Sequence, residues 1–152
     1  MARVRYPHIH NQFALIDPEP AEDDVFFDGG FDVIVCVQSI YYYTEAHMQT
    51  RLKSLERMLN PGGIFYATMM GTKSEYYDYS EPVGDGLSVI NMRTERKVRE
   101  NYHINFTESE QHLLSRFPMF EALDVGFYSE KFRSDEGQGF HYLFVGQKPE
   151  TR

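Results

Sequence analysis

The clearest pattern of hydrophobic and polar positions in this chain lies between residues 31 and 70. It opens with residues 33–37, an unbroken run of valine, isoleucine and cysteine, which is typical of a parallel strand covered on both faces. A segment with helical periodicity follows, and Thr44 precedes it as a candidate N-cap. Its apolar positions are Met48, Leu52, Leu55 and Leu59. We therefore predict a buried strand followed by an amphipathic helix.

The helix is expected to stop at residues 60–63, Asn-Pro-Gly-Gly, because proline cannot continue a helix and glycine allows a tight reversal. A second apolar run, residues 64–70, then predicts another strand. Strand, helix and strand within about 40 residues form a right-handed βαβ unit with parallel strands. Ligands of such units bind beyond the carboxyl ends of the strands.

Weaker patterns flank this unit. Residues 13–16 form a short apolar run that an acidic, proline-containing turn terminates, and we interpret them as a short strand. Further on, Thr107 and Glu110 match a capping box that would open a helix ended by Pro118.

The last two predicted strands are residues 120–128 and 140–147. The polar segment between them is too short for a helical crossover, so the two strands are expected to pair as an antiparallel hairpin. Together with the βαβ unit, this hairpin predicts an α/β fold with a mixed sheet.

Residues 71–106 differ in character from the rest of the chain, being polar, tyrosine-rich and only weakly periodic. A connection of that length without a clear element is usually a functional segment, so we predict a lid or substrate-binding insertion. Within it, residues 87–92 are expected to form a short strand and residues 94–100 a charged turn.

Composition narrows the class of protein. With 152 residues, 41% of them hydrophobic and 15% aromatic, the chain suits one globular domain. Its formal net charge of -8 disfavours a nucleic-acid partner, which would require a basic surface. No apolar run approaches the roughly 20 residues that span a bilayer, and the N-terminus lacks an apolar signal core. We therefore expect a cytoplasmic protein without a membrane partner.

Cysteine and histidine offer little reactive chemistry. The single cysteine, Cys36, lies inside a predicted buried strand, so a disulfide framework is excluded and an inert thiol is expected. The histidines lack the close spacing of a recognisable metal site, and we predict no metal.

Aromatic residues after the first buried strand are the best candidates for a site. Tyr41, Tyr42 and Tyr43 follow the carboxyl end of that strand, where a phenol can orient a substrate or take its proton. The alternative is that they pack into the helix interface. His47 has a near-neutral intrinsic pKa and is a candidate general base, although a helix first-turn residue without a catalytic role is the simpler explanation. The catalytic candidates are thus Tyr41 and His47.

The end of the second strand adds candidates for substrate contact. Alternation places one of Met69 and Met70 toward a pocket, and we select Met70. Tyr76 and Tyr77, in the lid-like segment, could stack over an apolar or cationic substrate. Core filling by the methionine and loop anchoring by the tyrosines remain open alternatives.

Four stretches of the sequence are distinctive when taken in order: FDVIVCVQSIYYY, LKSLERMLNPGGIFYATMMG, INFTESEQHLLSRFPMFEALDVGFYSE and HYLFVGQKP. Together they resemble the second half of class I S-adenosylmethionine-dependent methyltransferases. The resemblance covers residues 13–149, and its most distinctive part is the leucine-rich helix followed by Leu-Asn-Pro-Gly-Gly. It implies a Rossmann-like sheet in the family order 3-2-1-4-5-7-6. This chain would contain part of that sheet, with parallel strands and a C-terminal antiparallel hairpin.

The resemblance also implies a cofactor, S-adenosylmethionine, bound across the carboxyl ends of the strands. At matching positions, Asp17 would accept from the adenine amino group, and the methionine part of the cofactor would lie against Cys36, Val37 and Gln38. The three tyrosines at 41–43 would then face a small-molecule substrate.

The sequence departs from the family in lacking a GxGxG turn before Asp17 and an acidic residue for the ribose hydroxyls. Residues 1–152 thus match a single, N-terminally incomplete methyltransferase-like domain in which strand 33–37 would be an exposed edge. Three explanations remain open: a truncated chain, a half-domain that binds a second copy or a partner chain along this edge, or pairing of residues 13–16 with strand 33–37.

Function is expected to follow one of these alternatives. The leading hypothesis is S-adenosylmethionine-dependent methyl transfer to a small molecule, for which the isolated chain would be incompetent if its cofactor site is incomplete. The alternative is a non-catalytic interaction or dimerisation module. A weaker third reading is the half-sheet of a nicotinamide-dependent dehydrogenase, which the hairpin and the missing glycine fingerprint disfavour.

Overall fold

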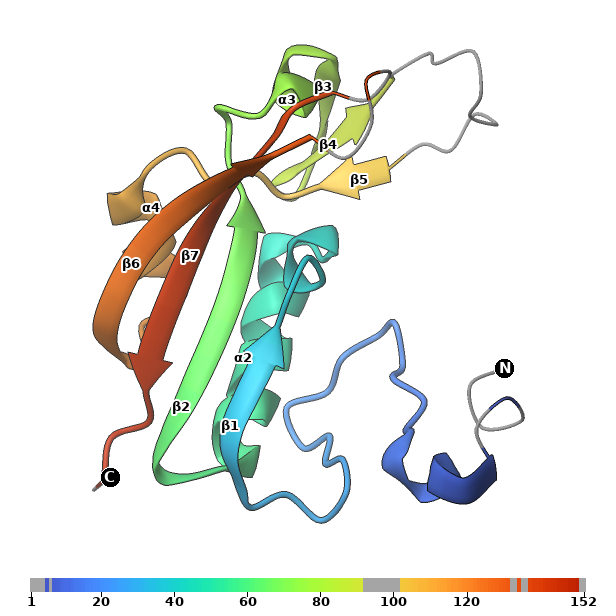
Figure 1. Cartoon of the computed structure of the whole chain (residues 1–152), viewed down its shortest axis with the longest axis vertical. Helices are drawn as coiled ribbons and strands as arrows, with labels where there is room; N and C mark the ends of the chain where they lie inside the picture. The colour runs from blue at the N-terminus through green and yellow to red at the C-terminus, as the bar shows by residue number, and fades with distance from the viewer. Residues whose placement is uncertain (1–4, 6, 92–101, 132–133, 135–136, 151–152) are drawn as a thin grey trace.

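A four-stranded mixed sheet and a smaller three-stranded antiparallel sheet form the frame of the chain in a computed structural model (Figure 1). The structure describes residues 5, 7–91, 102–131, 134 and 137–150. The helices are the 3-10 turns η1 (Pro7–Gln12) and η2 (Ile40–Tyr42), and α2 (Glu45–Met58), α3 (Glu75–Asp78) and α4 (Glu110–Arg116). The strands are β1 (Phe31–Cys36), β2 (Leu59–Met70), β3 (Ser80–Gly84), β4 (Leu87–Ile90), β5 (Tyr102–Ile104), β6 (Glu121–Glu130) and β7 (Gly139–Gln147).

The main sheet has the order β1-β2-β7-β6. Strands β1 and β2 are parallel, with Val35 opposite Tyr66, and α2 is the crossover between them. Strand β7 is antiparallel to both β2 and β6, so the predicted α/β fold with a closing antiparallel hairpin is confirmed. This order reproduces the 4-5-7-6 half of the sheet that the family resemblance implies.

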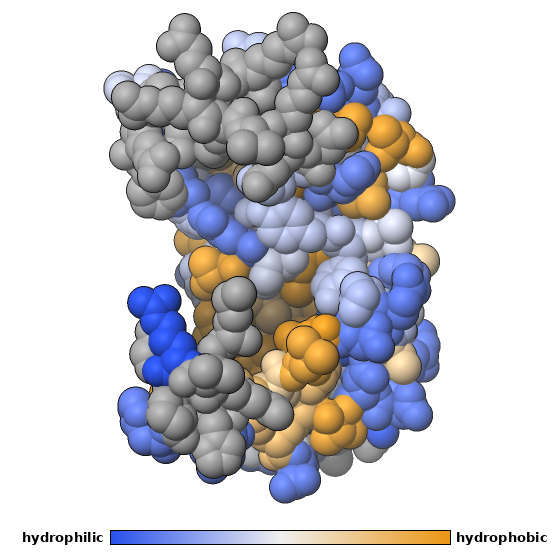
Figure 2. All heavy atoms as spheres, turned by 90° about the vertical axis from the view of Figure 1, so that its right-hand side faces the viewer, coloured by the Kyte–Doolittle hydropathy of each residue, from blue (hydrophilic) through white to orange (hydrophobic). Residues whose placement is uncertain are grey.

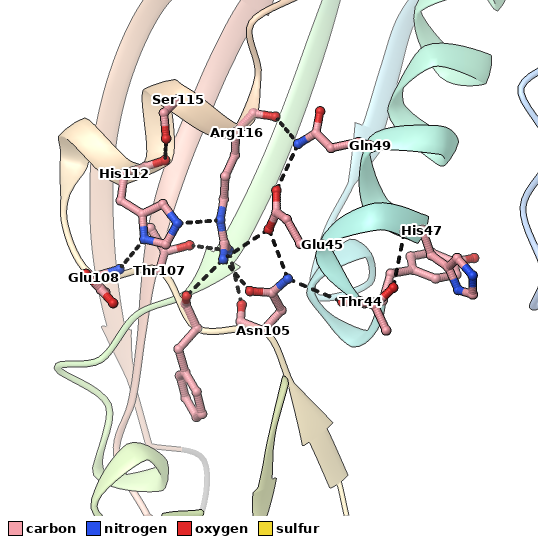
Figure 3. A network of polar contacts seen from close by, with 12 residues as sticks. Thr44, Glu45, His47, Gln49, Asn105, Thr107, Glu108, His112, Ser115 and Arg116 are labelled. Atoms are coloured by element: carbon pink, nitrogen blue, oxygen red, sulfur yellow. Dashed lines mark hydrogen bonds and ion pairs between the residues drawn. The ribbon is translucent and has the colours of Figure 1, made fainter. Parts of the chain in front are cut away.

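Both long helices cover the same face of the main sheet. Thr44 caps α2 as predicted, its side chain accepting from the backbone N–H of His47 at 3.2 Å. The Gln49 side chain of α2 donates to the backbone carbonyl of Arg116 in α4, which joins the two helices (Figure 3). The core lies between helices and sheet and includes buried Met48, Leu52, Phe65, Ala67, Leu113, Phe117 and Phe144.

The opposite face of β1 contradicts the expectation of a strand covered on both sides. Val33 and Val35 alternate with partly buried Ile34 and Cys36, which pack against the core. Val35 is 59% exposed, because no described helix covers this face of the strand. The continuous apolar pattern arises because both faces of β1 carry hydrophobic side chains. Only one of these faces is buried here.

The interpretation of residues 13–16 as a strand is wrong. They have no regular secondary structure, and Leu15 is 92% exposed. The chain from here to Asp24 runs beside α2, where Arg51 donates to the Asp17 carbonyl and to the Asp24 carboxylate. These polar contacts hold the segment away from the sheet, and among the described residues β1 pairs with β2 alone. Pairing of this segment with strand 33–37 is therefore excluded.

The N-cap of α4 also differs from the prediction. Ser109, and not Thr107, caps the helix by accepting from the backbone N–H of His112 at 3.1 Å. The Thr107 hydroxyl instead accepts from the buried Arg116 guanidinium at 3.0 Å. The helix itself, ending before Pro118, lies where the sequence predicts it.

The segment 71–106 contains more regular structure than the sequence indicates. Its second sheet has the order β3-β4-β5 and stands beyond the carboxyl ends of β1 and β2 (Figure 1). Strand β4 corresponds to the expected strand 87–92, but β3 and β5 were not anticipated. The predicted charged turn at 94–100 lies outside the described residues.

Candidate functional site

The carboxyl ends of β1 and β2 meet the beginning of β7 at one edge of the main sheet. Because β7 is antiparallel to β2, Met70 at the end of β2 lies opposite His141. On the other side of β7, Tyr128 of β6 also lies opposite His141. Directly paired residues share a sheet face, so this edge presents Met70, His141 and Tyr128 together. The face is the one that α2 and α4 leave uncovered.

Gln38 connects the end of β1 to this group. Its backbone N–H donates to the Thr68 hydroxyl at 2.8 Å. Its side-chain amide donates to the Tyr128 hydroxyl at 3.1 Å and to the Glu130 carboxylate at 2.6 Å. The Gln38 backbone has a φ of 46°, a left-handed conformation that residues other than glycine adopt with strain and often at functional sites. We call Gln38, Tyr128, Glu130 and His141 the carboxyl-edge cluster.

His141 is the most enclosed member of the carboxyl-edge cluster, with 1% of its surface exposed. Its ring stacks on Tyr128 at a centroid distance of 4.9 Å and lies 5.9 Å from the Tyr41 ring. Neither ring nitrogen has a hydrogen-bond partner within the described part of the chain. Burial lowers the pKa of His141 to about 4, so the imidazole is neutral at pH 7.

Tyr41 is also buried, and η2 together with the second sheet fixes its position. The backbone N–H of Asn105 donates to the Tyr41 carbonyl at 2.8 Å. Burial first, and then the neighbouring Tyr42, raises the pKa of Tyr41. Its phenol therefore stays protonated at neutral pH and can donate a hydrogen bond.

Tyr42, Tyr43 and His47 lie in different surroundings. Tyr42 is exposed and its ring lies 4.7 Å from that of Tyr41, whereas Tyr43 packs partly against the core. His47, in the first turn of α2, reaches Glu19 at 3.5 Å between His47 Nε2 and the Glu19 carboxylate. These residues occupy different sides of η2 and the helix start.

Three of the residues matched to the cofactor, Cys36, Val37 and Gln38, lie next to each other at the carboxyl end of β1. Cys36 faces the core, and burial raises the pKa of its thiol to about 11, so the thiol stays protonated. Val37 is 53% exposed, and Gln38 belongs to the carboxyl-edge cluster. Asp17 lies beside α2, where its carboxylate accepts from the backbone N–H of Glu19 at 3.0 Å.

The predicted substrate residues of the second strand and the insertion lie in two places. Met70 is buried beside His141. Tyr76 packs against the core, and Tyr77 is exposed with its ring 5.1 Å from Phe106. Both tyrosines belong to α3, whose Glu75 backbone N–H donates to the Gln138 carbonyl just before β7.

A buried polar network holds the second sheet over this edge (Figure 3). Arg116 of α4 donates to the Asn105 and Phe106 carbonyls at 3.2 and 3.1 Å and also to the Asn105 side chain. Asn105 in turn donates to Glu45 at the start of α2. The network ties together α2, α4 and the residues that follow β5, and thereby fixes the Tyr41 backbone that Asn105 holds.

Sequence reasoning missed Tyr128, Glu130 and His141 as site residues. Alternation along the predicted strand 140–147 places His141 and Phe140 on opposite faces. Only the pairing of β7 with β2 shows that His141 lies at the strand ends. No group of three or more metal-ligating side chains gathers in the described ranges. None of the helices in those ranges is long and apolar enough to cross a bilayer.

Comparison with known proteins places this geometry in a structural class. The sequence matches no protein-family model and no curated protein. Among solved structures, it is similar to an S-adenosylmethionine-dependent methyltransferase from Methanosarcina mazei, with a TM-score of 0.66 and 15% identity over 96% of this chain and 77% of that chain. A methyltransferase from Clostridium acetobutylicum has a TM-score of 0.59 and 13% identity, covering 97% of this chain and 70% of that chain.

A third neighbour was solved with a cofactor product. The N-methyltransferase NodS from Bradyrhizobium japonicum, in complex with S-adenosyl-L-homocysteine, has a TM-score of 0.50 and 14% identity over 98% of this chain and 62% of that chain. The chain therefore has a class I methyltransferase-like fold, and it spans about two thirds to three quarters of these neighbours' lengths.

Proposed function

We propose that this chain takes part in S-adenosylmethionine-dependent methyl transfer to a small molecule. The observation that carries the proposal is a methyltransferase-like sheet whose parallel strands end at a cluster of polar and aromatic side chains. Ligands of such sheets bind at the carboxyl ends of the strands. The NodS complex with S-adenosyl-L-homocysteine supports the same cofactor class by resemblance.

The residues present fit part of such a cofactor. Val37 is exposed at the strand end, and Gln38 presents a polar side chain beside it, as the methionine part would require. Asp17 fits less well, because it stands beside α2 and not at a strand end. The sequence also contains no GxGxG turn for the rest of the cofactor.

The side chains at this edge are suited to orientation. The cofactor supplies an electrophilic methyl group, and alignment of the acceptor with that group accounts for much of the rate in such reactions. Tyr41 can donate a hydrogen bond to an acceptor, and exposed Tyr42, partly buried Tyr43 and buried Met70 are the other candidates for substrate contact near these strand ends. Tyr76 and Tyr77 would contact the acceptor from α3, and His47 is the candidate base exposed to solvent.

Calorimetry with S-adenosylhomocysteine tests this proposal. Val37→Asp should abolish binding because it adds a charge at the methionine position. Leu123→Asp is the matched control, since Leu123 is 54% exposed on β6, away from the strand ends. Binding by the wild type and by Leu123→Asp, with loss in Val37→Asp, supports the proposal. A folded wild-type chain that binds neither S-adenosylmethionine nor S-adenosylhomocysteine at millimolar concentration would remove the claim of a self-sufficient enzyme.

A second candidate function is a non-catalytic interaction module that pairs through β1. Among the described residues β1 has one strand neighbour, and its exposed valines lie along that edge. Figure 2, which views the right-hand side of Figure 1, shows apolar side chains gathered in a hollow between polar regions. An apolar edge strand is a template for another chain, and a second copy is the occupant that we propose.

Light scattering on the purified chain tests the interaction module. A dimer that Val35→Lys dissociates and Leu123→Lys leaves intact would support pairing through β1, because the two residues are exposed to similar extents on different strands. A wild-type chain that stays monomeric at a concentration of about 100 μM, where a dimer with a Kd in the micromolar range would form, would contradict it.

A further inference from the structure

The Gln38 side chain occupies a position that is built to receive an amino group. Its carboxamide nitrogen donates two hydrogen bonds, one to the Tyr128 hydroxyl at 3.1 Å and one to the Glu130 carboxylate at 2.6 Å. An amide NH2 and a protonated primary amine both donate hydrogen bonds from one nitrogen. The carboxamide thus shows the arrangement that an amine would make with the same two acceptors.

The His141 ring adjoins both of these acceptors. Its Nδ1 lies 3.8 Å from the Glu130 carboxylate, and its ring stacks on Tyr128. A neutral imidazole always has one nitrogen that can accept a hydrogen bond. Because the ring is 1% exposed and both nitrogens lack a partner in the described residues, it is a buried polar group with unused capacity.

The charge around this position favours a cation. In the described parts of the chain, the ion contact recorded for Glu130 is the one with His141, which is neutral at pH 7. The Tyr128 and His141 rings stack at an interplanar angle of 10°, so these two rings cover each other's faces, and Tyr128 meets the amine position through its hydroxyl. Within the described ranges no lysine or arginine pairs with Glu130, so an ammonium at this position would add a charge-assisted contact there.

We propose that Tyr128 and Glu130 bind the primary amino group of a small molecule, at the position that the Gln38 carboxamide occupies in this structure and next to the buried His141 ring. If the proposed function holds, this amine is the methyl acceptor. An ammonium forms charge-assisted hydrogen bonds with Glu130, which are stronger than those of a neutral amide, so it displaces Gln38.

The experiment measures amine binding to the full chain without any cofactor. Benzylamine is the probe, and benzyl alcohol is the control with nearly the same shape but no charge. Binding is followed by calorimetry and by NMR signals of labelled histidine rings. We expect benzylamine to bind, to shift the His141 ring signals and to bind at least tenfold more tightly than benzyl alcohol.

Two substitutions locate the site. Glu130→Gln should weaken benzylamine binding at least tenfold, whereas Glu121→Gln, at the other end of β6, should leave it unchanged. Gln38→Gly should strengthen binding roughly tenfold, because it removes the competing carboxamide while glycine tolerates the left-handed backbone. Tyr128→Phe removes only a hydroxyl and should weaken binding without unfolding the chain.

Equal binding of benzylamine and benzyl alcohol would overturn the proposal, as would unchanged affinity in both Glu130→Gln and Tyr128→Phe. The result is separable from the proposed function. Amine binding without S-adenosylhomocysteine binding would retain this site and reject methyl transfer by the isolated chain. Cofactor binding without amine binding would reject this amine site and leave the proposed methyl transfer standing.

Discussion

Arg116, in the last turn of α4, donates to the Asn105 backbone carbonyl at 3.2 Å and also to the Asn105 side chain. Asn105 is the residue that follows β5 and holds the Tyr41 carbonyl. The second sheet is therefore fixed to the main domain by a buried cation, and the position of Tyr41 depends on the same contacts (Figure 3).

Replacing this cation should be costly. Arg116→Ala leaves the Asn105 and Phe106 carbonyls and the Thr107 hydroxyl without their donor, and we expect a loss of about 3–5 kcal/mol in the free energy of unfolding. Arg57→Ala is the matched control, because Arg57 lies in the last turn of α2 but makes an exposed contact. Its cost should be about 0.5 kcal/mol or less. Urea denaturation measures both values, and similar costs would contradict a structural role for the network.

Stability should fall in mild acid because of His141. Its pKa is about 4 in the folded chain and about 6.5 when unfolded, so the unfolded chain binds the proton first as the pH drops. This contribution is complete above pH 6.5 and is lost between pH 6.5 and 4, with a total of roughly 3 kcal/mol. Urea denaturation across this range measures it. In His141→Phe the slope should be much smaller, and an unchanged slope would show that His141 does not titrate this way.

His112 should add a smaller effect in the same direction. Burial and the neighbouring Arg116 lower the pKa of His112. Its Nε2 accepts from the Arg116 side chain at 3.1 Å, and protonation removes that acceptor. Stability from this contact is present above pH 6.5 and declines as the pH falls below it. His112→Asn should reduce the slope that remains in His141→Phe, and NMR titration of the His112 ring should give a midpoint below 6.5.

The N-cap of α2 offers a direct test of the helix start. Thr44→Ala removes the acceptor for the His47 N–H and should cost about 1 kcal/mol. Thr50→Ala is the control, because the Thr50 hydroxyl only donates back to the Ala46 carbonyl within the helix. That change should be neutral or slightly stabilising, since alanine favours helix more than threonine does. Thermal or urea unfolding of the two variants distinguishes them.

Gly71 is required by close packing beside the site. A Cβ at this position would lie 2.8 Å from the rings of Phe140 and Tyr142, so Gly71→Ala should destabilise the chain by about 1–3 kcal/mol. Gly126→Ala is the matched control, because its Cβ would meet Leu143 at an ordinary 3.7 Å. We expect the control to change the free energy of unfolding by less than about 0.5 kcal/mol. Equal effects in the two variants would mean that the rings move aside freely.

Several features of this fold follow from the sequence alone because they depend on short-range physics. Helix periodicity and the cap at Thr44 define α2, and the residues after it enforce a reversal in which Gly62 adopts a φ of 74°. The short connection between β6 and β7 leaves an antiparallel hairpin as the simplest pairing. Tyr41 follows a strand end, and on that basis it stays a predicted site residue.

Tertiary structure decided the rest, because the outcome depended on partners distant in the chain. Residues 13–16 are apolar enough for a strand but run beside α2, and Thr107 gives its hydroxyl to Arg116 while Ser109 caps the helix. The carboxyl-edge cluster joins Gln38 to Glu130 across 92 positions. A local sequence pattern does not show which distant residues come into contact. The cluster forms because β7 lies between β2 and β6 in the sheet.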